Sequence, residues 1–154
     1  MNLTNSRLNP IASENHNCYE CYAQLLIYPA DIHPDQISEY LNLEATKVNV
    51  IGDTSTNSLG KVREIKLAGW FLSSEKNIES KDLREHLDWL INKLIPVKIQ
   101  LASLQDIDNV KMTLCCVWRS RYGHSGPVLW PEQMKNISDL NLECSFDIYF
   151  NSDE

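Results

Sequence analysis

The sequence predicts a single α+β domain, built as a sandwich of one mixed or antiparallel sheet with helices on one face. Its 154 residues suffice for one hydrophobic core but are short for two. Segments with alternating apolar residues, as in strands, are separated by segments with apolar residues at helical spacing. Hydrophobic residues make up 43% and charged residues 23% of the chain, which is typical of a globular domain.

The first third of the chain predicts an arm, a strand and a short helix. Residues 1–16 are polar and lack periodicity, so we expect a flexible N-terminal arm before a domain over residues 17–150. Residues 19–28 (YECYAQLLIY) are rich in aromatic and aliphatic side chains and predict the first strand. Pro34 suits the first position of a helix that runs to about Asn42. The apolar edge of this helix consists of Ile37, Tyr40 and Leu41.

The middle of the chain predicts a long loop, a strand and the main helix. Residues 44–60 contain two glycines and many Thr, Ser and Asn residues, which are typical of a loop. Residues 61–75 (KVREIKLAGWFLSSE) predict a strand, and a helix follows over residues 80–95. Ser80 is the expected N-cap of this helix, and Pro96 ends it. Its apolar stripe consists of Leu83, Leu87, Leu90, Ile91 and Leu94.

The last third predicts two helices and two strands. Residues 98–105 form a shorter helix, and residues 110–118 (VKMTLCCVW) form a strand apolar enough to be interior. A loop with Gly, Ser and Pro leads to a helix that begins at Pro131. Residues 142–150 (LECSFDIYF) alternate as the final strand, and a solvated tail follows at 151–154. The residues expected to point inward from the helix after the loop are Met134, Ile137 and Leu140.

A weak internal repeat suggests how these elements combine. HPDQISEYLNLE, at residues 33–44, resembles WPEQMKNISDLNLE, at residues 130–143, and each segment lies between two predicted strands. We therefore expect two βαβ halves joined by the helix at 80–95, an arrangement nearest to the ferredoxin-like fold. A chance likeness stays open, because proline followed by an acidic residue and Gln is a common start of a helix.

The charge distribution limits the kinds of partner. The net charge is −7, and residues 61–100 contain eight basic and six acidic residues, so the acidic excess lies outside this central block. This acidic balance argues against nucleic acid as a direct ligand, because phosphate binding needs clustered Lys and Arg. An acidic surface suits a basic protein partner, although solubility alone would also explain it.

The sequence contains no feature that predicts a membrane segment, a secretory signal or a metal site. It has no run of ~18 apolar residues and no apolar signal region near its start, so we expect a cytoplasmic protein without membrane contacts. The five cysteines include a Cys18-x-x-Cys21 motif, but structural zinc needs four converging ligands. Cys115 and Cys116 point to opposite faces of a strand. We expect buried free thiols, with no metal and no cofactor.

Acidic residues and one Trp are the best candidates for partner binding. Asp31, Asp35 and Glu39 form an acidic patch around the first helix, and Asp53 adds charge to the loop that follows. Paired carboxylates perform acid–base chemistry only in a cleft, and on an exposed helix they are usually just solvated. Trp89 lies far around its helix from the apolar stripe. It is therefore either an exposed interface anchor or a residue covered by the arm or the next helix.

The loop at residues 119–126 is the candidate site for a small ligand. Arg119, Arg121 and His124 could cradle an anion, helped by backbone N–H groups near the two glycines of the loop. The loop has neither the Gly-Lys-Ser of a P-loop nor the spacing of a nucleophile elbow. The alternative is an ordinary exposed loop whose arginines pair with nearby acids.

Three further segments are informative: GWFLSS at residues 69–74, the helix HLDWLINKLIP and the closing strand ECSFDIYF. They resemble the bacterial family called domain of unknown function 4279, and the resemblance extends over residues 19–150. It implies a small, single-domain bacterial protein, and it brings no established activity, cofactor or catalytic residue. Such families often occur beside toxin genes as candidate immunity proteins, which is an association and not a mechanism.

We therefore expect a non-enzymatic binding protein, namely an immunity protein that neutralises a cognate toxin by occluding a basic active-site region. An enzyme or small-anion-binding protein that uses the loop at 119–126 is the first alternative, and a self-associating structural domain is the second. The sequence predicts no oligomeric state. The expected partner-binding residues are Asp31, Asp35, Glu39, Asp53 and Trp89.

Overall fold

The computed structural model describes residues 6–150, which form a five-stranded sheet, a separate two-stranded hairpin and helices. The strands of the sheet are β1 (Cys18–Tyr28), β2 (Lys47–Asn49), β5 (Gly69–Ser73), β6 (Lys111–Ser120) and β7 (Cys144–Phe150). Their order across the sheet is β2-β5-β1-β6-β7. β1 pairs antiparallel with β5 and β6, β2 pairs antiparallel with β5, and β6 pairs parallel with β7. The sheet is therefore mixed, with β1 at its centre.

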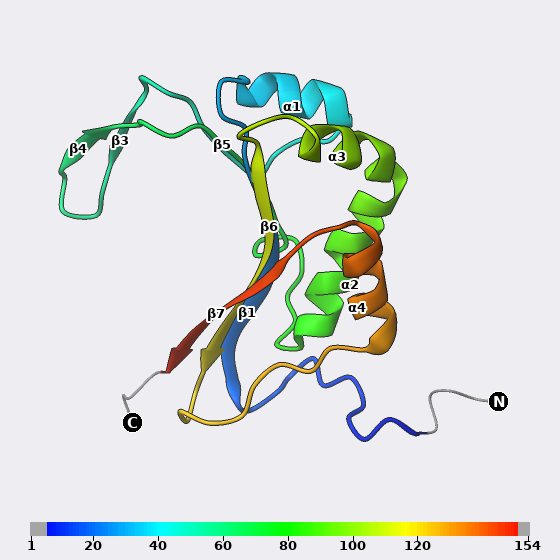
Figure 1. The fold of residues 1–154 in the computed structure, drawn as a ribbon. Helices are drawn as coiled ribbons and strands as arrows, with labels where there is room; N and C mark the ends of the chain where they lie inside the picture. Colours follow the sequence, from blue (N-terminus) through cyan, green and yellow to red (C-terminus); the bar gives the residue numbers. More distant parts are fainter. Residues whose placement is uncertain (1–5, 151–154) are drawn as a thin grey trace.

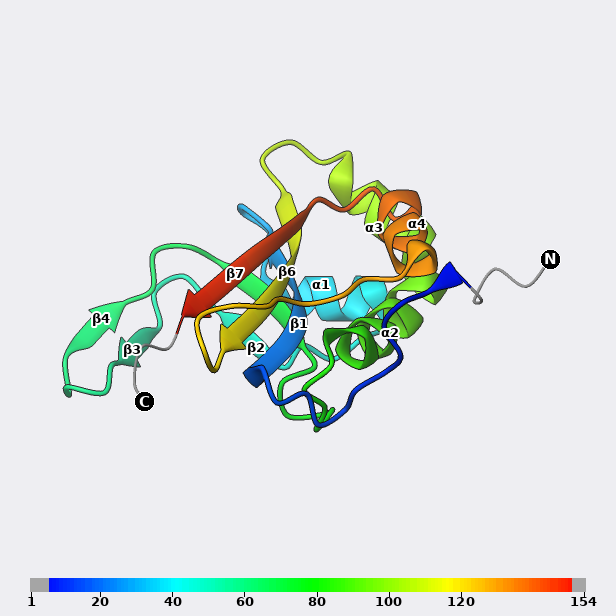
Figure 2. The same ribbon diagram turned by 90° about the horizontal axis from the view of Figure 1, so that it is seen from below.

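All the described helices lie on the same face of this sheet (Figure 1). They are α1 (Pro34–Leu41), α2 (Leu83–Leu94), the 3-10 helix η2 (Ile95–Val97), α3 (Lys98–Gln105) and α4 (Pro131–Asp139). The view from below shows the same separation of strands from helices (Figure 2). The predicted α+β fold, with a mixed sheet and helices on one face, is confirmed.

The two halves suggested by the repeat differ in their strand pairing. β6, α4 and β7 form a parallel βαβ unit, because β6 and β7 are parallel neighbours. β1 and β5 flank α1 in the chain but pair antiparallel, and β2 and the hairpin are inserted between them. The resemblance to a ferredoxin-like fold therefore lies in the layered architecture and not in the pairing of equivalent halves.

The main helix α2 begins two residues later than the sequence indicates. Asp82 is its N-cap, and its carboxylate accepts a hydrogen bond from the Arg84 backbone N–H at 3.1 Å. The Ser80 hydroxyl instead accepts a hydrogen bond from the backbone N–H of Asp82 at 3.0 Å, just before the helix begins. At the other end, Pro96 lies inside η2, where a short 3-10 turn joins α2 to α3. The predicted stop near Pro96 is confirmed, whereas Ser80 as the N-cap was wrong.

The hydrophobic core fills the space between the helices and the covered face of the sheet. All five residues of the predicted α2 stripe are buried, together with alternate residues of β1 such as Leu25 and Ile27. Two residues expected to face inward do not: Tyr40 on α1 is 47% exposed and Met134 on α4 is 51% exposed. In these two short helices about one residue per turn is buried in the core, such as Ile137 in α4.

The predicted strand at 61–75 is divided into two strands that belong to different sheets. Its first part is β4 (Val62–Glu64), which pairs with β3 (Thr54–Thr56) as an antiparallel hairpin. Its second part is β5 in the main sheet. The hairpin projects away from the sheet (Figure 1), and every residue from 51 to 64 is exposed. The long predicted loop therefore folds largely as this projecting hairpin.

The part of the N-terminal arm that the structure describes is held against the start of α2. The Arg84 guanidinium donates to the carbonyl groups of Asn9 and Pro10 at 2.7 and 2.9 Å, while Asp82 accepts the N–H of Ala12 at 2.8 Å. Asp82 and Arg84 also form a buried ion pair at 2.7 Å. The arm was expected to be flexible; its first five residues lie outside the described part, and residues 9–12 are tied to this pair.

Candidate partner-binding site

Helix α1 is held by hydrogen bonds at both of its ends and on its inner side. The His33 side chain accepts the N–H of Asp35 at 3.0 Å, and Gln36 accepts the N–H of His33 at 3.3 Å, which completes a capping box. Asn42 ends the helix in a left-handed conformation, with φ of 52°. On the inner side, the Trp70 indole donates to Ser38 Oγ at 2.8 Å. The outer side chains of α1 are therefore presented from a well-defined backbone.

One side of α1 borders an acidic hollow of about 490 Å³. The lining residues include three carboxylates and no cationic side chain: Asp35, Ser38, Glu39, Asn42, Leu43 and Glu44. The His33 imidazole lies outside this lining, with Nδ1 3.7 Å from the Asp35 carboxylate, and both side chains are exposed. The lining of the hollow therefore carries three carboxylates and no Lys or Arg.

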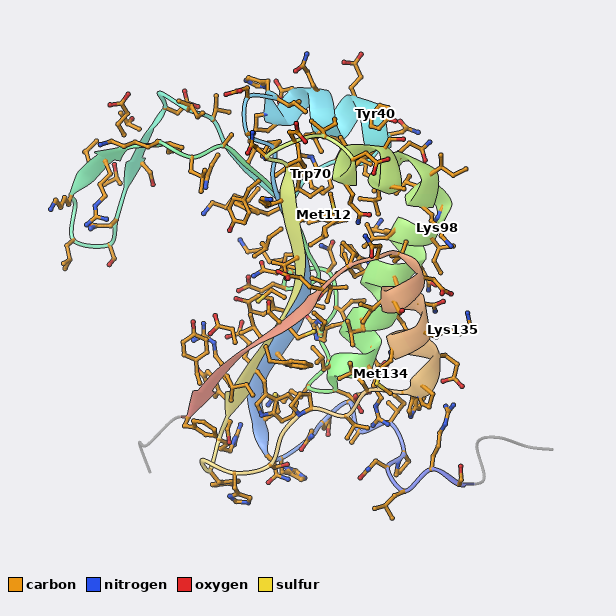
Figure 3. The ribbon with its side chains drawn as sticks, in the orientation of Figure 1. Tyr40, Trp70, Lys98, Met112, Met134 and Lys135 are labelled. Atoms are coloured by element: carbon orange, nitrogen blue, oxygen red, sulfur yellow. The ribbon has the colours of Figure 1, made fainter. Side chains whose placement is uncertain are left out.

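The other side of α1 borders an apolar groove of about 410 Å³, formed with α3. Its lining residues are Ile32, Gln36, Ile37, Tyr40, Ser103, Leu104 and Ile107. Tyr40 and Ile107 are 47% and 43% exposed, so part of the groove wall is open to a partner. Figure 3 shows Tyr40 on α1, the helix whose Ser38 accepts the indole N–H of the buried Trp70. Acidic and apolar surfaces therefore adjoin the same short helix.

The other two predicted acids lie in the turn before this helix and at the base of the hairpin. Asp31 lies in the exposed turn between β1 and α1, and it lines a small hollow with Val50 and Ile51 from the base of the hairpin. Asp53 is exposed at that base, where its carbonyl accepts the N–H of Ile65 at 2.7 Å. The turn before α1 and the base of the hairpin are thus neighbours, although they are separated in the chain.

Trp89 comes from a different helix, α2, and is neither fully exposed nor fully buried. Its ring packs partly against the hydrophobic core. The ammonium of Lys93, one turn later, lies 5.0 Å from the ring centroid in a cation–π contact. The Lys93 side chain therefore covers part of the indole, and Trp89 does not share an element with the acidic residues.

Sequence reasoning missed three residues of the α1 surface. Glu44 follows the helix and adds the third carboxylate to the hollow. Tyr40 was expected to face the core. Ile107 lies in the turn after α3, outside any helical or strand pattern in the sequence. The helical position of Tyr40, next to the deeply buried Leu41, was the one signal that could have placed it at the margin.

The candidate anion loop at 119–126 has partners of its own. The Arg119 guanidinium lies 3.4 Å from the Glu20 carboxylate and 5.0 Å from the ring centroid of Tyr149. The His124 ring stacks on Tyr122, with the centroids 6.2 Å apart. Arg121 and His124 are exposed. Arg119 thus shows the pairing with an acid that was the alternative interpretation, and anion binding by this loop stays a prediction.

A buried serine–histidine pair lies beneath the start of α2. His86 Nε2 lies 2.7 Å from the Ser80 carbonyl, which can only accept, so Nε2 carries the proton. His86 Nδ1 then accepts the hydroxyl proton of Ser74 at 2.6 Å, and Ser74 Oγ accepts the Ala23 N–H at 3.0 Å. Ser74 and His86 are almost completely buried, so no substrate can reach the hydroxyl. The pair joins β1, the end of β5 and α2.

The described residues also limit the chemistry of other groups. Within residues 6–150, no cluster of three or more His, Cys, Asp or Glu side chains is arranged to hold a metal ion. The five cysteines are free thiols, and all but Cys144 are buried. No helix in the described part of the chain is long and apolar enough to cross a membrane.

The comparisons with known proteins identify one family. A family model described as "Domain of unknown function (DUF4279)" matches residues 19–151, which is most of the chain. No curated protein and no solved structure matches the sequence.

Proposed function

The chain belongs to the family described as Domain of unknown function (DUF4279), and from its own surface we propose that it is a non-enzymatic protein-binding module that uses α1. One observation supports this proposal: α1 lies between an acidic hollow and an apolar groove. Protein interfaces commonly combine an apolar, aromatic centre with a charged rim. Tyr40 would supply the aromatic anchor, with Asp35 and Glu39 as the rim.

We further propose that the partner is a basic toxin and that the protein is a bacterial immunity protein. The net charge of −7 and the three carboxylates of the hollow suit a positively charged surface. Toxins that cleave or bind nucleic acid carry such surfaces, because phosphate binding requires Lys and Arg. Inhibition would then be steric: the bound protein occupies the basic region and excludes the toxin's substrate.

The mechanism needs only binding, in two stages. Long-range attraction between the acidic hollow and the basic partner first accelerates the encounter, and salt weakens this attraction. The Debye length falls from ~10 Å at 0.1 M to ~3 Å at 1 M salt. Burial of Tyr40 and the groove then slows dissociation, because desolvated aromatic anchors act mainly on the off-rate. The two surfaces of α1 thus affect different rate constants.

The direct test uses the protein encoded beside this gene as the candidate toxin. Co-expression should restore the growth of cells that produce the toxin, and the purified proteins should associate at a rate that falls with salt. The Asp35→Lys, Glu39→Lys double variant should lower the on-rate and flatten its salt dependence. A matched control is the Glu75→Lys, Glu79→Lys variant, which reverses two exposed acids in the loop before α2 and should leave the on-rate nearly unchanged.

Tyr40 and Trp89 are alternative aromatic anchors, and single variants distinguish them. Tyr40→Ala should raise the off-rate by a factor equivalent to about 2 kcal/mol or more, with little change in melting temperature. Trp89→Ala should lower the melting temperature, since Trp89 packs on the core, and leave the affinity nearly unchanged. The reverse pattern would move the binding surface to α2. A neighbouring toxin that fails to bind at micromolar concentration would refute the immunity function.

A further inference from the structure

Strand β7 is an open edge of the main sheet with an unusually apolar surface. It pairs with β6 on one side and is the last strand in the sheet order. Phe146, Ile148 and Phe150 lie opposite β6 residues of the covered face, yet they are 45%, 43% and 63% exposed. The helices cover β6 but leave most of β7 bare, and Figure 2 shows β7 extending away from them.

The edge lacks the features that normally prevent strand pairing. Natural edge strands are usually interrupted by Lys, Pro or a bulge, or are very short. β7 has seven residues (CSFDIYF), with no Lys, Arg or Pro and with Asp147 as its one charged residue. The Asp147 carboxylate accepts a hydrogen bond from the Tyr149 hydroxyl at 3.0 Å. The strand is therefore regular enough to pair with another strand along its length.

The backbone direction shows which residues have free hydrogen-bonding groups. The Glu143 carbonyl accepts the N–H of Leu114 in β6 at 2.9 Å, so its backbone groups face β6. Because these directions alternate along a strand, the even-numbered residues turn their N–H and C=O groups to the open edge. Phe146, Ile148 and Phe150 thus combine free backbone groups with exposed apolar side chains.

The sequence of β7 is complementary to itself in one antiparallel register. With a two-fold axis at Ile148, Ile148 lies opposite its own copy, and Phe146 lies opposite Phe150 of the second copy. These pairs are all apolar and all on the helix-side face. On the other face, Asp147 lies opposite Tyr149 of the second copy, so the acid meets a hydroxyl donor and no like charges face each other. An axis at Asp147 would instead bring the two carboxylates together.

We propose that this edge binds a second copy of the chain, with the two β7 strands paired antiparallel about Ile148 into one continuous ten-stranded sheet. The interface is isologous, because each copy contributes the same seven residues. The hollow of about 800 Å³ between α4 and the start of β7 is lined by Met134 and by Phe146, which faces Phe150 of the second copy in this pairing. The α1 surface belongs to the opposite part of the sheet order, near β2 and β5, so dimerisation leaves it free.

The first experiment measures the mass of the purified protein by light scattering and sedimentation. The wild-type protein should have twice the 17.7 kDa mass of one chain at sub-millimolar concentration. Ile148→Lys should be monomeric, because it places two like charges opposite each other at the axis. The control is Ile99→Lys, which changes an 80% exposed isoleucine on α3 and should remain dimeric. A monomeric wild-type protein would overturn the proposal.

The second experiment tests the register with two changes at one exposed position. In the Tyr149→Asp variant, each copy would place an acid opposite Asp147 of the other copy, which gives two repulsive pairs in the dimer. The dimer dissociation constant should rise about tenfold or more. Tyr149→Lys would place a cation there and should keep the dimer, with a new dependence on salt. Circular dichroism must show that both variants are folded. A dimer that is equally stable in both variants would overturn this register, and one that also survives Ile148→Lys would overturn the β7 interface.

Discussion

Among single residues, His86 shows best how burial determines chemistry in this protein. Its ring donates a hydrogen bond to the Ser80 carbonyl and accepts one from the Ser74 hydroxyl, and the bond from Ser74 requires the neutral form of the ring. Burial disfavours the charged form and lowers the pKa of His86 below its usual value, although nearby acids oppose this effect. A serine hydroxyl bonded to a histidine ring also occurs in catalytic sites, but Ser74 and His86 are both buried. We therefore assign this pair a structural role.

The lowered pKa of His86 predicts a loss of stability in mild acid. The unfolded chain takes up a proton near pH ~6.5, whereas the folded chain resists protonation to a lower pH. Between these two pKa values the unfolded state binds more protons, so stability is full above about pH 6.5 and falls as the pH decreases. Urea unfolding measured between pH 7.5 and pH 5 should show that the free energy of unfolding falls as the pH decreases. His86→Gln should be less stable at neutral pH and show a flatter profile, and an unchanged slope in this variant would contradict the assignment.

Cys144 is predicted to be the most reactive thiol. It is partly exposed, while the other four cysteines are buried. Its Sγ lies 3.8 Å from Cys116 Sγ, and this hydrogen bond lowers the pKa of Cys144 even though burial opposes ionisation. Iodoacetamide should therefore modify Cys144 first in the native protein, as shown by peptide mass spectrometry. Cys116→Ala removes the donor and should slow the reaction, and equally fast labelling of Cys18 or Cys21 would contradict this prediction.

The buried pair of Asp82 and Arg84 is predicted to be a major source of stability. Burial opposes ionisation of Asp82, but hydrogen bonds from Arg84 and the Ala12 N–H hold its pKa below the usual value. Arg84→Ala should cost about 3–5 kcal/mol in urea unfolding, because it leaves a buried carboxylate without its cation. The Asp82→Ala, Arg84→Ala double variant should lose less than the sum of the single losses. Additive losses would mean that the two groups do not interact.

Among the structural elements, the hairpin of β3 and β4 contributes little to the core. Its strands pair with each other, and residues 51–64 are all exposed. This contrasts with α2, which buries its complete apolar stripe between the sheet and α4. The two elements adjoin in sequence but differ in what their side chains contact.

Removing the hairpin should therefore leave the fold intact. Replacement of residues 54–64 by Asn-Gly between Asp53 and Ile65 should change the free energy of unfolding by less than about 1 kcal/mol, since few buried contacts are lost. Leu87→Ala in α2 is the contrasting variant and should cost about 2–5 kcal/mol, because Leu87 is completely buried. Both values come from urea titration. A large loss in the hairpin variant would show that the hairpin supports the sheet.

At the scale of the whole molecule, one face of the sheet is covered by helices and the other is open (Figure 1). The open face carries a hollow of about 670 Å³, where Tyr28 and Phe71 meet edge to face with their centroids 5.7 Å apart. An antiparallel sheet tolerates such one-sided exposure when polar residues alternate with apolar ones. The exposed surfaces of the described residues thus include α1, the β7 edge and this open face.

The sequence by itself determined the fold class and most of the regular elements. Apolar periodicity located β1 and α2, and a continuous apolar run located β6, each to within a few residues, because these patterns are local properties of the chain. Proline positions correctly predicted the starts of α1 and α4, since proline acts on its own backbone and that of its neighbour. Acidic residues near α1 were also recognisable, because their spacing is local.

Only the tertiary structure decided which elements meet and which side chains they cover. It placed β1 between β5 and β6, exposed Tyr40, and tied the described arm to the pair of Asp82 and Arg84. It also revealed the apolar groove beside Tyr40, whose far wall comes from a helix some 60 residues later. These features depend on contacts between segments that are distant in the chain. A local sequence pattern cannot show which of these contacts form or how much they stabilise the fold.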